Sequence, residues 1–176
     1  GLFFPIMILK QDAKVRKKQM LHSVLRTNAV YLRNIKIYKD MKQEKAIFAA
    51  GCFWGVQHQF QRVNGVLNTV VGYTGGPEEN PKYPEVKAHQ THHVEAIVVD
   101  YDADIVSYED LCKVFFEIHD PAQTDGVGPD IGPQYRSEIF YLNEEQKEIA
   151  EKVIALLRSM GHEVNTILRP AEKFWE

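Results

Sequence analysis

The sequence predicts an α+β fold, a two-layer sandwich in which helices pack on one face of a mostly antiparallel sheet. Short apolar runs typical of strands alternate with amphipathic stretches of helical period. From Lys45 onward, Gly and Asn residues separate these segments. The order of the segments is strand, helix, strand, strand, helix, strand, which is the order of the ferredoxin-like split unit.

The first half of this unit contains three strands and one helix. Residues 45–50 form an apolar run suited to a buried strand, and a tight turn at Cys52 separates it from a helical stretch over residues 53–63. Residues 66–73 and 94–101 predict the second and third strands, because both are rich in β-branched side chains. Cys52 is therefore expected between a strand and the start of a helix.

The second half opens with a capping box, in which Ser107 and Asp110 are three positions apart at the start of the next helix. Residues 135–142 predict the fourth strand. Asn143 then caps a long amphipathic helix that extends to Met160, and residues 164–168 add a last short strand.

The charge distribution divides the chain into two parts. Residues 1–45 hold 11 of the 21 Lys and Arg but only 3 of the 24 Asp and Glu. We therefore interpret residues 1–42 as a basic extension outside the core and residues 43–176 as a single folded domain. No apolar run reaches the roughly 18 residues of a membrane-spanning helix, so no membrane contact is expected.

The basic extension leaves the compartment open. A cytoplasmic location is the expectation, while targeting to an organelle by residues 1–42 stays an alternative. Nucleic acid is not expected as a partner, because no aromatic residues for base stacking are interleaved with these charges.

The strongest local signal is the sequence Gly-Cys-Phe-Trp-Gly around Cys52. A thiol at a helix N-terminus lies near the positive end of the helix dipole, which favours the nucleophilic thiolate. Phe53 and Trp54 beside it would form an apolar wall suited to a sulfoxide methyl group. Position alone leaves a second reading open, in which Cys52 is a small buried residue between two core aromatics.

The sequence around Cys52 and four further blocks resemble the type A peptide methionine sulfoxide reductase family. The blocks occur in the family's order between residues 46 and 175, which is far more specific than any one of them. They comprise residues 51–55, 71–76, 80–83, 93–95 and 132–137. The resemblance implies an α+β sandwich with the nucleophilic Cys52 at the start of the first helix.

An acidic residue, Glu95, is aimed toward the apolar side of the third predicted strand. By alternation it faces the same side as His93 and Ile97, and burial would keep its carboxyl protonated. The resemblance implies that Glu95 protonates the sulfoxide oxygen, that Tyr83 and Tyr135 also hold this oxygen, and that Asp130 lines the same pocket. A salt-bridged structural glutamate is the alternative.

The resemblance implies a thiol reaction without a bound cofactor. Cys52 attacks the sulfoxide sulfur of free or protein-bound methionine S-sulfoxide and becomes a sulfenic acid, and thioredoxin supplies the reducing thiols. No metal is expected, because His89, His92 and His93 lack a fourth ligand with convincing spacing.

The second thiol of this reaction is not assigned. Family members commonly carry a resolving cysteine in a C-terminal tail, and this chain ends at Glu176, where that tail is expected to begin. Cys112 is the internal candidate, but its place in the middle of a predicted helix favours a packed structural residue.

Two other functions stay open on the sequence alone. One is a different cysteine-dependent enzyme, a transferase or hydrolase that pairs Cys52 with one of the loop histidines. The other is an inactive domain that acts as a binding module, with its basic extension contacting an acidic partner.

Overall fold

The computed structural model describes Arg26, Val30, Arg33 and residues 42–176. The chain divides into two compact units, Gly1–Met41 and Lys42–Glu176. Apart from the positions just named, the predicted basic extension over residues 1–42 lies outside the described residues. The second unit carries the sheet, its helices and both cysteines.

Within this unit the main sheet has five strands in the order β2-β3-β1-β6-β7. The strands are β1 (Gln43–Ala50), β2 (Val66–Thr74), β3 (Val94–Asp102), β6 (Ser137–Tyr141) and β7 (Ile167–Pro170). Neighbouring strands are antiparallel except β6 and β7, which are parallel. The predicted mostly antiparallel α+β sheet is confirmed.

The helices connect strands that are not neighbours. Helix α2 (Phe53–Phe60) joins β1 to β2, and α4 (Tyr108–Glu117) leads from β3 toward β6. Both pairs of strands run parallel with a third strand between them, since β1 and β2 are each antiparallel to β3, and β3 and β6 are each antiparallel to β1. This is the split βαβ arrangement that the order of segments predicted.

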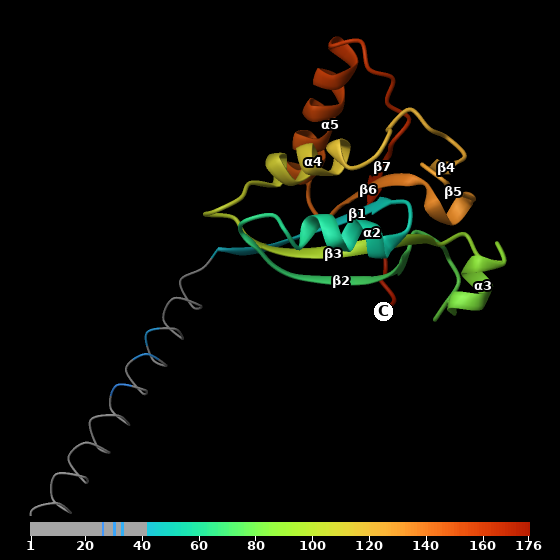
Figure 1. Cartoon of the computed structure of the whole chain (residues 1–176), viewed down its shortest axis with the longest axis horizontal. Coiled ribbons are helices and arrows are strands. Elements are labelled where there is room, and N and C mark those ends of the chain that lie inside the picture. Colours follow the sequence, from blue (N-terminus) through green and yellow to red (C-terminus); the bar gives the residue numbers. More distant parts are fainter. Residues whose placement is uncertain (1–25, 27–29, 31–32, 34–41) are drawn as a thin grey trace, which may run out of the picture. The chain divides into compact units, whose positions relative to one another are not determined.

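The larger core lies between the sheet and the helices α2, α4 and α5 (Glu144–Ser159) (Figure 1). Side chains alternate along β1, so Ala46, Phe48 and Ala50 face the helices. Phe48 is fully buried and stacks on Phe60 and Phe115, with ring centroids 5.2 Å apart in both pairs. Phe48 thereby packs the central strand against two helices at once.

The opposite face of the sheet is covered by the end of the chain. Ala171 and Phe174 pack against a small cluster that includes Ile47 and Ala49. Trp175 pairs with Tyr73 in an antiparallel bridge, donating its N–H to Tyr73 O at 2.9 Å and accepting from Tyr73 N–H at 2.7 Å. The end of the chain is thereby fixed along the edge strand β2.

Helices α4 and α5 begin at the predicted caps. Ser107 accepts a hydrogen bond from the Asp110 N–H at 3.1 Å, and Asn143 Oδ1 accepts from the Gln146 N–H at 2.9 Å. Each cap satisfies an N–H group that has no partner within its own helix.

The structure differs from the prediction between α4 and β6. Tyr135 lies in a short 3-10 turn, Pro133–Tyr135, and not in the fourth strand, because its N–H donates to Gly132 O at 3.1 Å within the turn and pairing with β1 begins only at Ser137. A small hairpin of β4 (Gly126–Val127) and β5 (Asp130–Ile131) and a short helix α3 (Tyr83–Lys87) were also not predicted. These segments are too short to have a recognisable period.

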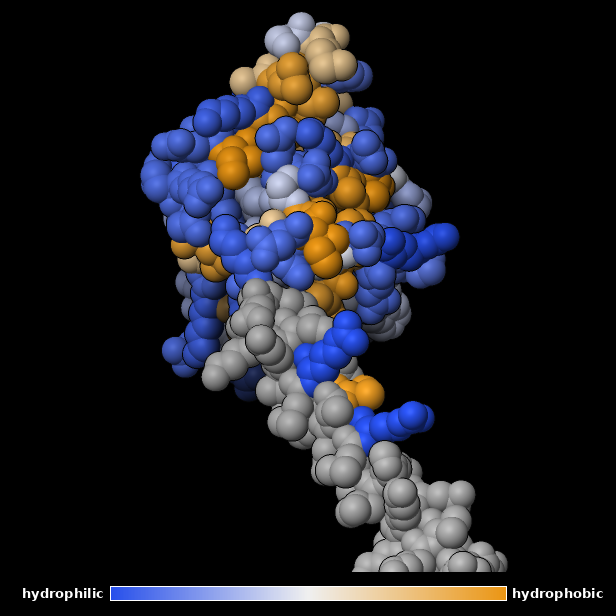
Figure 2. Space-filling model, turned by 90° about the vertical axis from the view of Figure 1, so that its left-hand side faces the viewer, coloured by the Kyte–Doolittle hydropathy of each residue, from blue (hydrophilic) through white to orange (hydrophobic). Residues whose placement is uncertain are grey.

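The end of the domain remote from Cys52 is seen in Figure 2, where hydrophilic residues are interspersed with smaller apolar areas. Among the described residues, no helix is long and apolar enough to cross a membrane.

Replacement of Phe48 by alanine tests the packing of the larger core. We expect Phe48→Ala to lower the free energy of unfolding by about 3–5 kcal/mol, because it leaves a cavity between the sheet and two helices. Urea denaturation would measure the loss. Ile105→Ala is the control, since Ile105 is 56% exposed and its truncation should change stability by no more than about 0.5 kcal/mol. A loss below about 1 kcal/mol for Phe48→Ala would contradict this account.

Candidate active site

The predicted site residues lie at one end of the sheet, where strands begin or end. Strands β1 and β2 terminate at this end and β3 and β6 begin there, because the two pairs run in opposite directions (Figure 1). Cys52 follows β1, Tyr83 follows β2, Glu95 is near the start of β3, and Tyr135 precedes β6. Residues far apart in the sequence therefore meet around Cys52.

Cys52 is the N-cap residue of α2. Its carbonyl accepts hydrogen bonds from the N–H groups of Gly55 at 3.1 Å and Val56 at 3.3 Å. The preceding Gly51 has φ +85°, and a Cβ there would come within 2.9 Å of Val127 Cβ. Only glycine fits this turn easily, and the turn presents Cys52, which is partly exposed, at the helix N-terminus.

Glu95 lies beside Phe53, the residue after Cys52, and is almost fully buried. It is 4% exposed, and its Oε2 accepts a hydrogen bond from the Phe53 N–H at 3.0 Å. Burial raises the pKa of Glu95, the Phe53 N–H lowers it, and the nearby Asp130 raises it again, with a net rise. The predicted burial of Glu95 on the helix-facing side of β3 agrees with the structure, and its carboxyl can hold a proton that an exposed glutamate would lose.

Two aromatic rings cluster around that of Phe53, the residue that follows Cys52. Phe53 is buried, and its ring lies 5.7 Å from that of Tyr73 and 5.8 Å from that of Trp54. Trp54 is 67% exposed, so it extends the apolar surface outward from the buried ring. The two predicted aromatic residues thus form one cluster with Tyr73 at the start of α2, directly after Cys52.

Tyr135 lies close to the Glu95 carboxyl, and Tyr83 lies close to Tyr73. Burial and then the charge of Glu95 raise the pKa of Tyr135, which also lies close enough to Asp130 and Cys52 to be affected by their charge. Tyr83 is the first residue of α3 and is 49% exposed. Tyr135 therefore keeps its hydroxyl proton at neutral pH and can donate a hydrogen bond beside Cys52.

Tyr73 is a site residue that the sequence reasoning missed. It is directly opposite Glu95 in the pairing of β2 with β3, so the two side chains share one face of the sheet. Burial, and then the proximity of Glu95, Tyr83 and Tyr135, raise the pKa of Tyr73 to about 12. Its place within residues 71–76, one of the blocks that carry the family resemblance, was the available signal, but its contact with Glu95 depends on strand pairing.

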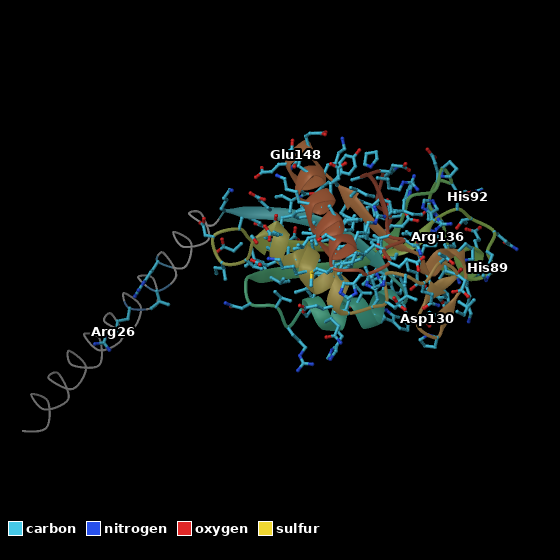
Figure 3. All side chains as sticks on the ribbon, turned by 90° about the horizontal axis from the view of Figure 1, so that it is seen from above. Arg26, His89, His92, Asp130, Arg136 and Glu148 are labelled. Atoms are coloured by element: carbon cyan, nitrogen blue, oxygen red, sulfur yellow. The ribbon has the colours of Figure 1, made fainter. Side chains whose placement is uncertain are left out.

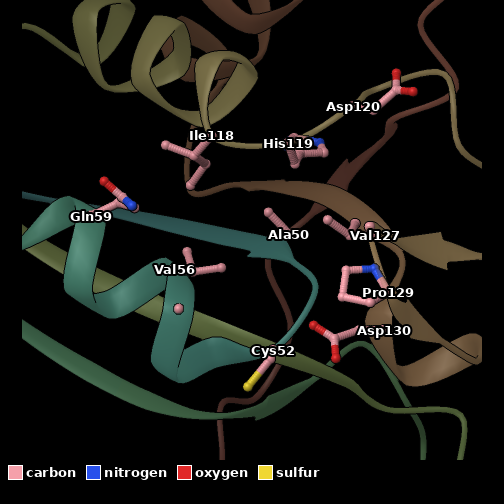
Figure 4. Close-up of a pocket in the computed structure, with 12 residues that line it drawn as sticks. Ala50, Cys52, Val56, Gln59, Ile118, His119, Asp120, Val127, Pro129 and Asp130 are labelled. Carbon is pink, nitrogen blue, oxygen red and sulfur yellow. The ribbon is translucent and has the colours of Figure 1, made fainter.

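A pocket of about 300 Å³ lies between the first turns of α2 and the segment that follows α4. Cys52 and Asp130 both line it, together with His119 and Val127 (Figure 4). Asp130 comes from the β4–β5 hairpin, which the sequence did not predict, yet this hairpin brings Asp130 to the pocket that Cys52 lines.

His92 and His93 are hydrogen-bonded to the loop that follows β2. His93 is buried, accepts a hydrogen bond from the Gly76 N–H at Nδ1 and lies 2.7 Å from Glu78 O through Nε2. His92 lies 2.6 Å from Glu78 Oε1, and this hydrogen bond lowers the pKa of Glu78 to about 2. His89 and His92 lie at the same end of the domain as Asp130 (Figure 3).

The residues that the structure describes contain no group of three His, Cys, Asp or Glu side chains that could hold a metal ion.

Cys112 differs from Cys52 in its surroundings. It lies in the middle of α4, is 0% exposed and belongs to the larger core. Burial raises its pKa to about 12. Its thiol is thus held in the unreactive protonated form, as the prediction of a packed structural residue requires.

Comparison with known proteins decides the family. Residues 44–176 match the family model described as peptide methionine sulfoxide reductase. The chain belongs to this family. It is 48% identical over 131 residues to the peptide methionine sulfoxide reductase MsrA of Nautilia profundicola, a match that covers 74% of this chain and 76% of that protein.

Solved structures support the same assignment. The domain resembles Mxr1 from Saccharomyces cerevisiae in its reduced form with a TM-score of 0.71 and 29% sequence identity, over 77% of this chain and 80% of that one. Mxr1 solved in complex with Trx2 has a TM-score of 0.56 and 23% identity, over 77% and 81% of the two chains, and supports the fold alone. The predicted type A reductase and its fold are confirmed, and the other cysteine enzyme and the binding module are not favoured.

The two thiols of this reductase domain should differ sharply toward an alkylating reagent. In the native protein we expect iodoacetamide to modify Cys52 and to leave Cys112 unmodified, because Cys112 is fully buried and protonated. Mass spectrometry of the intact and digested protein would count and locate the adducts. Denatured protein, in which both cysteines should react, is the control, and rapid labelling of Cys112 in the folded chain would contradict this account of the core.

Proposed function

We propose that residues 43–176 form a catalytic domain that reduces methionine S-sulfoxide, with Cys52 as nucleophile and Glu95 as proton donor. The observation that carries this proposal is the hydrogen bond from the Phe53 N–H to Glu95 Oε2 at 3.0 Å. It joins a buried carboxyl to the residue that follows Cys52. The thiol can therefore attack the sulfoxide sulfur while the carboxyl donates a proton to the oxygen bonded to it. The basic residues 1–42 are proposed as an extension outside this domain.

In the proposed reaction, the Cys52 thiolate attacks the sulfoxide sulfur while Glu95 donates a proton to the sulfoxide oxygen. The oxygen leaves the methionine sulfur and is retained by Cys52 as a sulfenic acid. Methionine sulfur gains two electrons and Cys52 sulfur loses two. The released product is methionine.

The surrounding side chains are proposed to bind the sulfoxide group. The buried ring of Phe53 and the exposed ring of Trp54 contact the methyl group, which is apolar. Tyr83 and Tyr135 donate hydrogen bonds to the oxygen as negative charge develops there. Asp130 lines the same pocket as Cys52, and its proximity favours the protonated form of Glu95.

The catalytic cycle is completed by thiols and needs no bound cofactor. A first thiol condenses with the sulfenic acid and releases water, and a second thiol reduces the resulting disulfide. We propose thioredoxin as the source, and Mxr1, which has the same fold, has been solved in complex with Trx2. Cys112 is a poor resolving thiol, because it is 0% exposed in the middle of α4. Such a reducing system would suit the cytoplasm.

The proposed reaction is tested by single-turnover reduction of the separated epimers of a methionine sulfoxide peptide. With dithiothreitol as reductant, we expect the wild-type protein to consume the S epimer and leave the R epimer. Cys52→Ser should be slower by at least about 1,000-fold, because a serine hydroxyl cannot attack the sulfur as a thiolate does and cannot be oxidised to a sulfenic acid. Chromatography of the peptide would measure both rates.

Cys112→Ser is the matched control for this experiment and should retain activity if it folds. Absence of turnover by a folded wild-type domain would refute the proposed function, and equal use of both epimers would refute the proposed selectivity.

The role of Glu95 predicts a specific pH dependence. A carboxyl donates a proton only below its pKa, and the raised pKa of Glu95 extends this range above the usual value of about 4.3. We expect kcat/KM to fall as the pH rises through that raised pKa. Glu95→Gln should lose this alkaline limb and have a kcat about 100-fold lower, because an amide cannot supply the proton.

The pH profile is measured with reductant in excess so that sulfoxide reduction limits the rate. Glu79→Gln is the control, since Glu79 is exposed in the loop after β2, and it should keep the wild-type profile. An unchanged alkaline limb in Glu95→Gln would show that another group donates the proton.

A further inference from the structure

The β4–β5 hairpin that carries Asp130 is a separate element with little pairing of its own. Its two strands have two residues each and form their own small sheet apart from the main one. A hairpin of this length is only marginally stable without further contacts. The position of the hairpin, and of Asp130 within it, therefore depends on contacts with other segments of the domain.

One contact of the hairpin leads directly to the nucleophile. Val127 packs against Gly51, where no Cβ intervenes and an added one would lie 2.9 Å from Val127 Cβ. In the pairing of β4 with β5, Val127 is opposite Asp130. One cross-strand pair of the hairpin thus supplies both Val127, which contacts the turn before Cys52, and Asp130.

The side chain of Gln123 is hydrogen-bonded to the turn of the hairpin. Gln123 Oε1 accepts a hydrogen bond from the Gly128 N–H at 2.7 Å, and Gln123 Nε2 donates to Gly128 O at 3.2 Å. The same Nε2 also donates to Asp125 Oδ1 at 2.9 Å. Both backbone groups of Gly128 are therefore bonded to a single amide group, which fixes the turn in distance and in orientation.

The segment that carries Gln123 is itself anchored to the domain. Asn165, just before β7, donates its backbone N–H to Pro121 O and its Nδ2 to Ala122 O, both at 2.8 Å. Gln123 thereby connects the anchored segment after α4 to the turn of the hairpin. The base of the hairpin has a separate hydrogen bond, from the Gly132 N–H to Asp125 O at 2.9 Å.

We propose that Gln123 is a positioning residue for sulfoxide reduction: its amide fixes the β4–β5 turn so that Asp130 and Cys52 line one pocket. Gln123 does not belong to the lining of that pocket, so it acts through the hairpin and not on the substrate. The inference rests on the proposed function, because it assigns Gln123 a role in that reaction.

The test is a double-mutant cycle with Asp130. Gln123→Met removes the hydrogen bonds at similar side-chain length, Gln123→Ala removes them with the bulk of the side chain, and each is combined with Asp130→Asn. We expect each Gln123 variant to lower kcat/KM for an S-sulfoxide peptide about tenfold, mainly through KM, because a small displacement of a binding group weakens productive binding. In the Asp130→Asn background the same change should cost less than about twofold.

The controls separate this role from a purely structural one. Gln90→Ala, at an exposed glutamine of the same domain, should leave kcat/KM unchanged. Equal losses with and without Asp130 would overturn the inference, as would unchanged kinetics in both Gln123 variants. Loss of folding by both variants in circular dichroism would also overturn it, because the contact would then maintain the domain. An inactive wild-type protein would instead refute the proposed function.

Discussion

The hydrogen bond between the Phe53 N–H and Glu95 determines the arrangement of the site. It joins the first turn of α2, which follows β1, to the start of β3, so the elements that carry Cys52 and Glu95 are linked directly. The bond uses an N–H that has no partner within its own helix, and it compensates part of the cost of burying a carboxyl. Because β1 and β3 are also paired along six residues of β1, the sheet supports the geometry that this bond completes.

Burial explains how ordinary side chains acquire different roles at this end of the sheet. Glu95 and Tyr73 face each other across two paired strands and are both more than nine-tenths buried, so each resists ionisation. A protonated carboxyl and a protonated phenol can donate hydrogen bonds to an oxygen that gains charge. Trp54 and Tyr83, in contrast, are exposed to solvent.

The two cysteines illustrate how position decides reactivity. Both lie in or next to a helix. Cys52 is the N-cap residue of α2, at the end of the sheet, whereas Cys112 lies on the side of α4 that packs in the larger core. Burial leaves Cys112 protonated and inaccessible, whereas the turn at Gly51 brings Cys52 to the pocket. The same side chain thus packs a core in one place and is available for chemistry in the other.

The amino-acid sequence by itself determined the order of the longer strands and helices, the caps at Ser107 and Asn143, and the placement of Cys52 at a helix N-terminus. These features depend on local periodicity and local hydrogen bonds. Family resemblance supplied Glu95, Tyr83, Tyr135 and Asp130. Only the tertiary structure decided that Tyr73 faces Glu95, that Tyr135 lies in a 3-10 turn and that Gln123 holds the hairpin of Asp130. These features depend on strand pairing and on contacts between short loops, which leave no periodic signal in the chain.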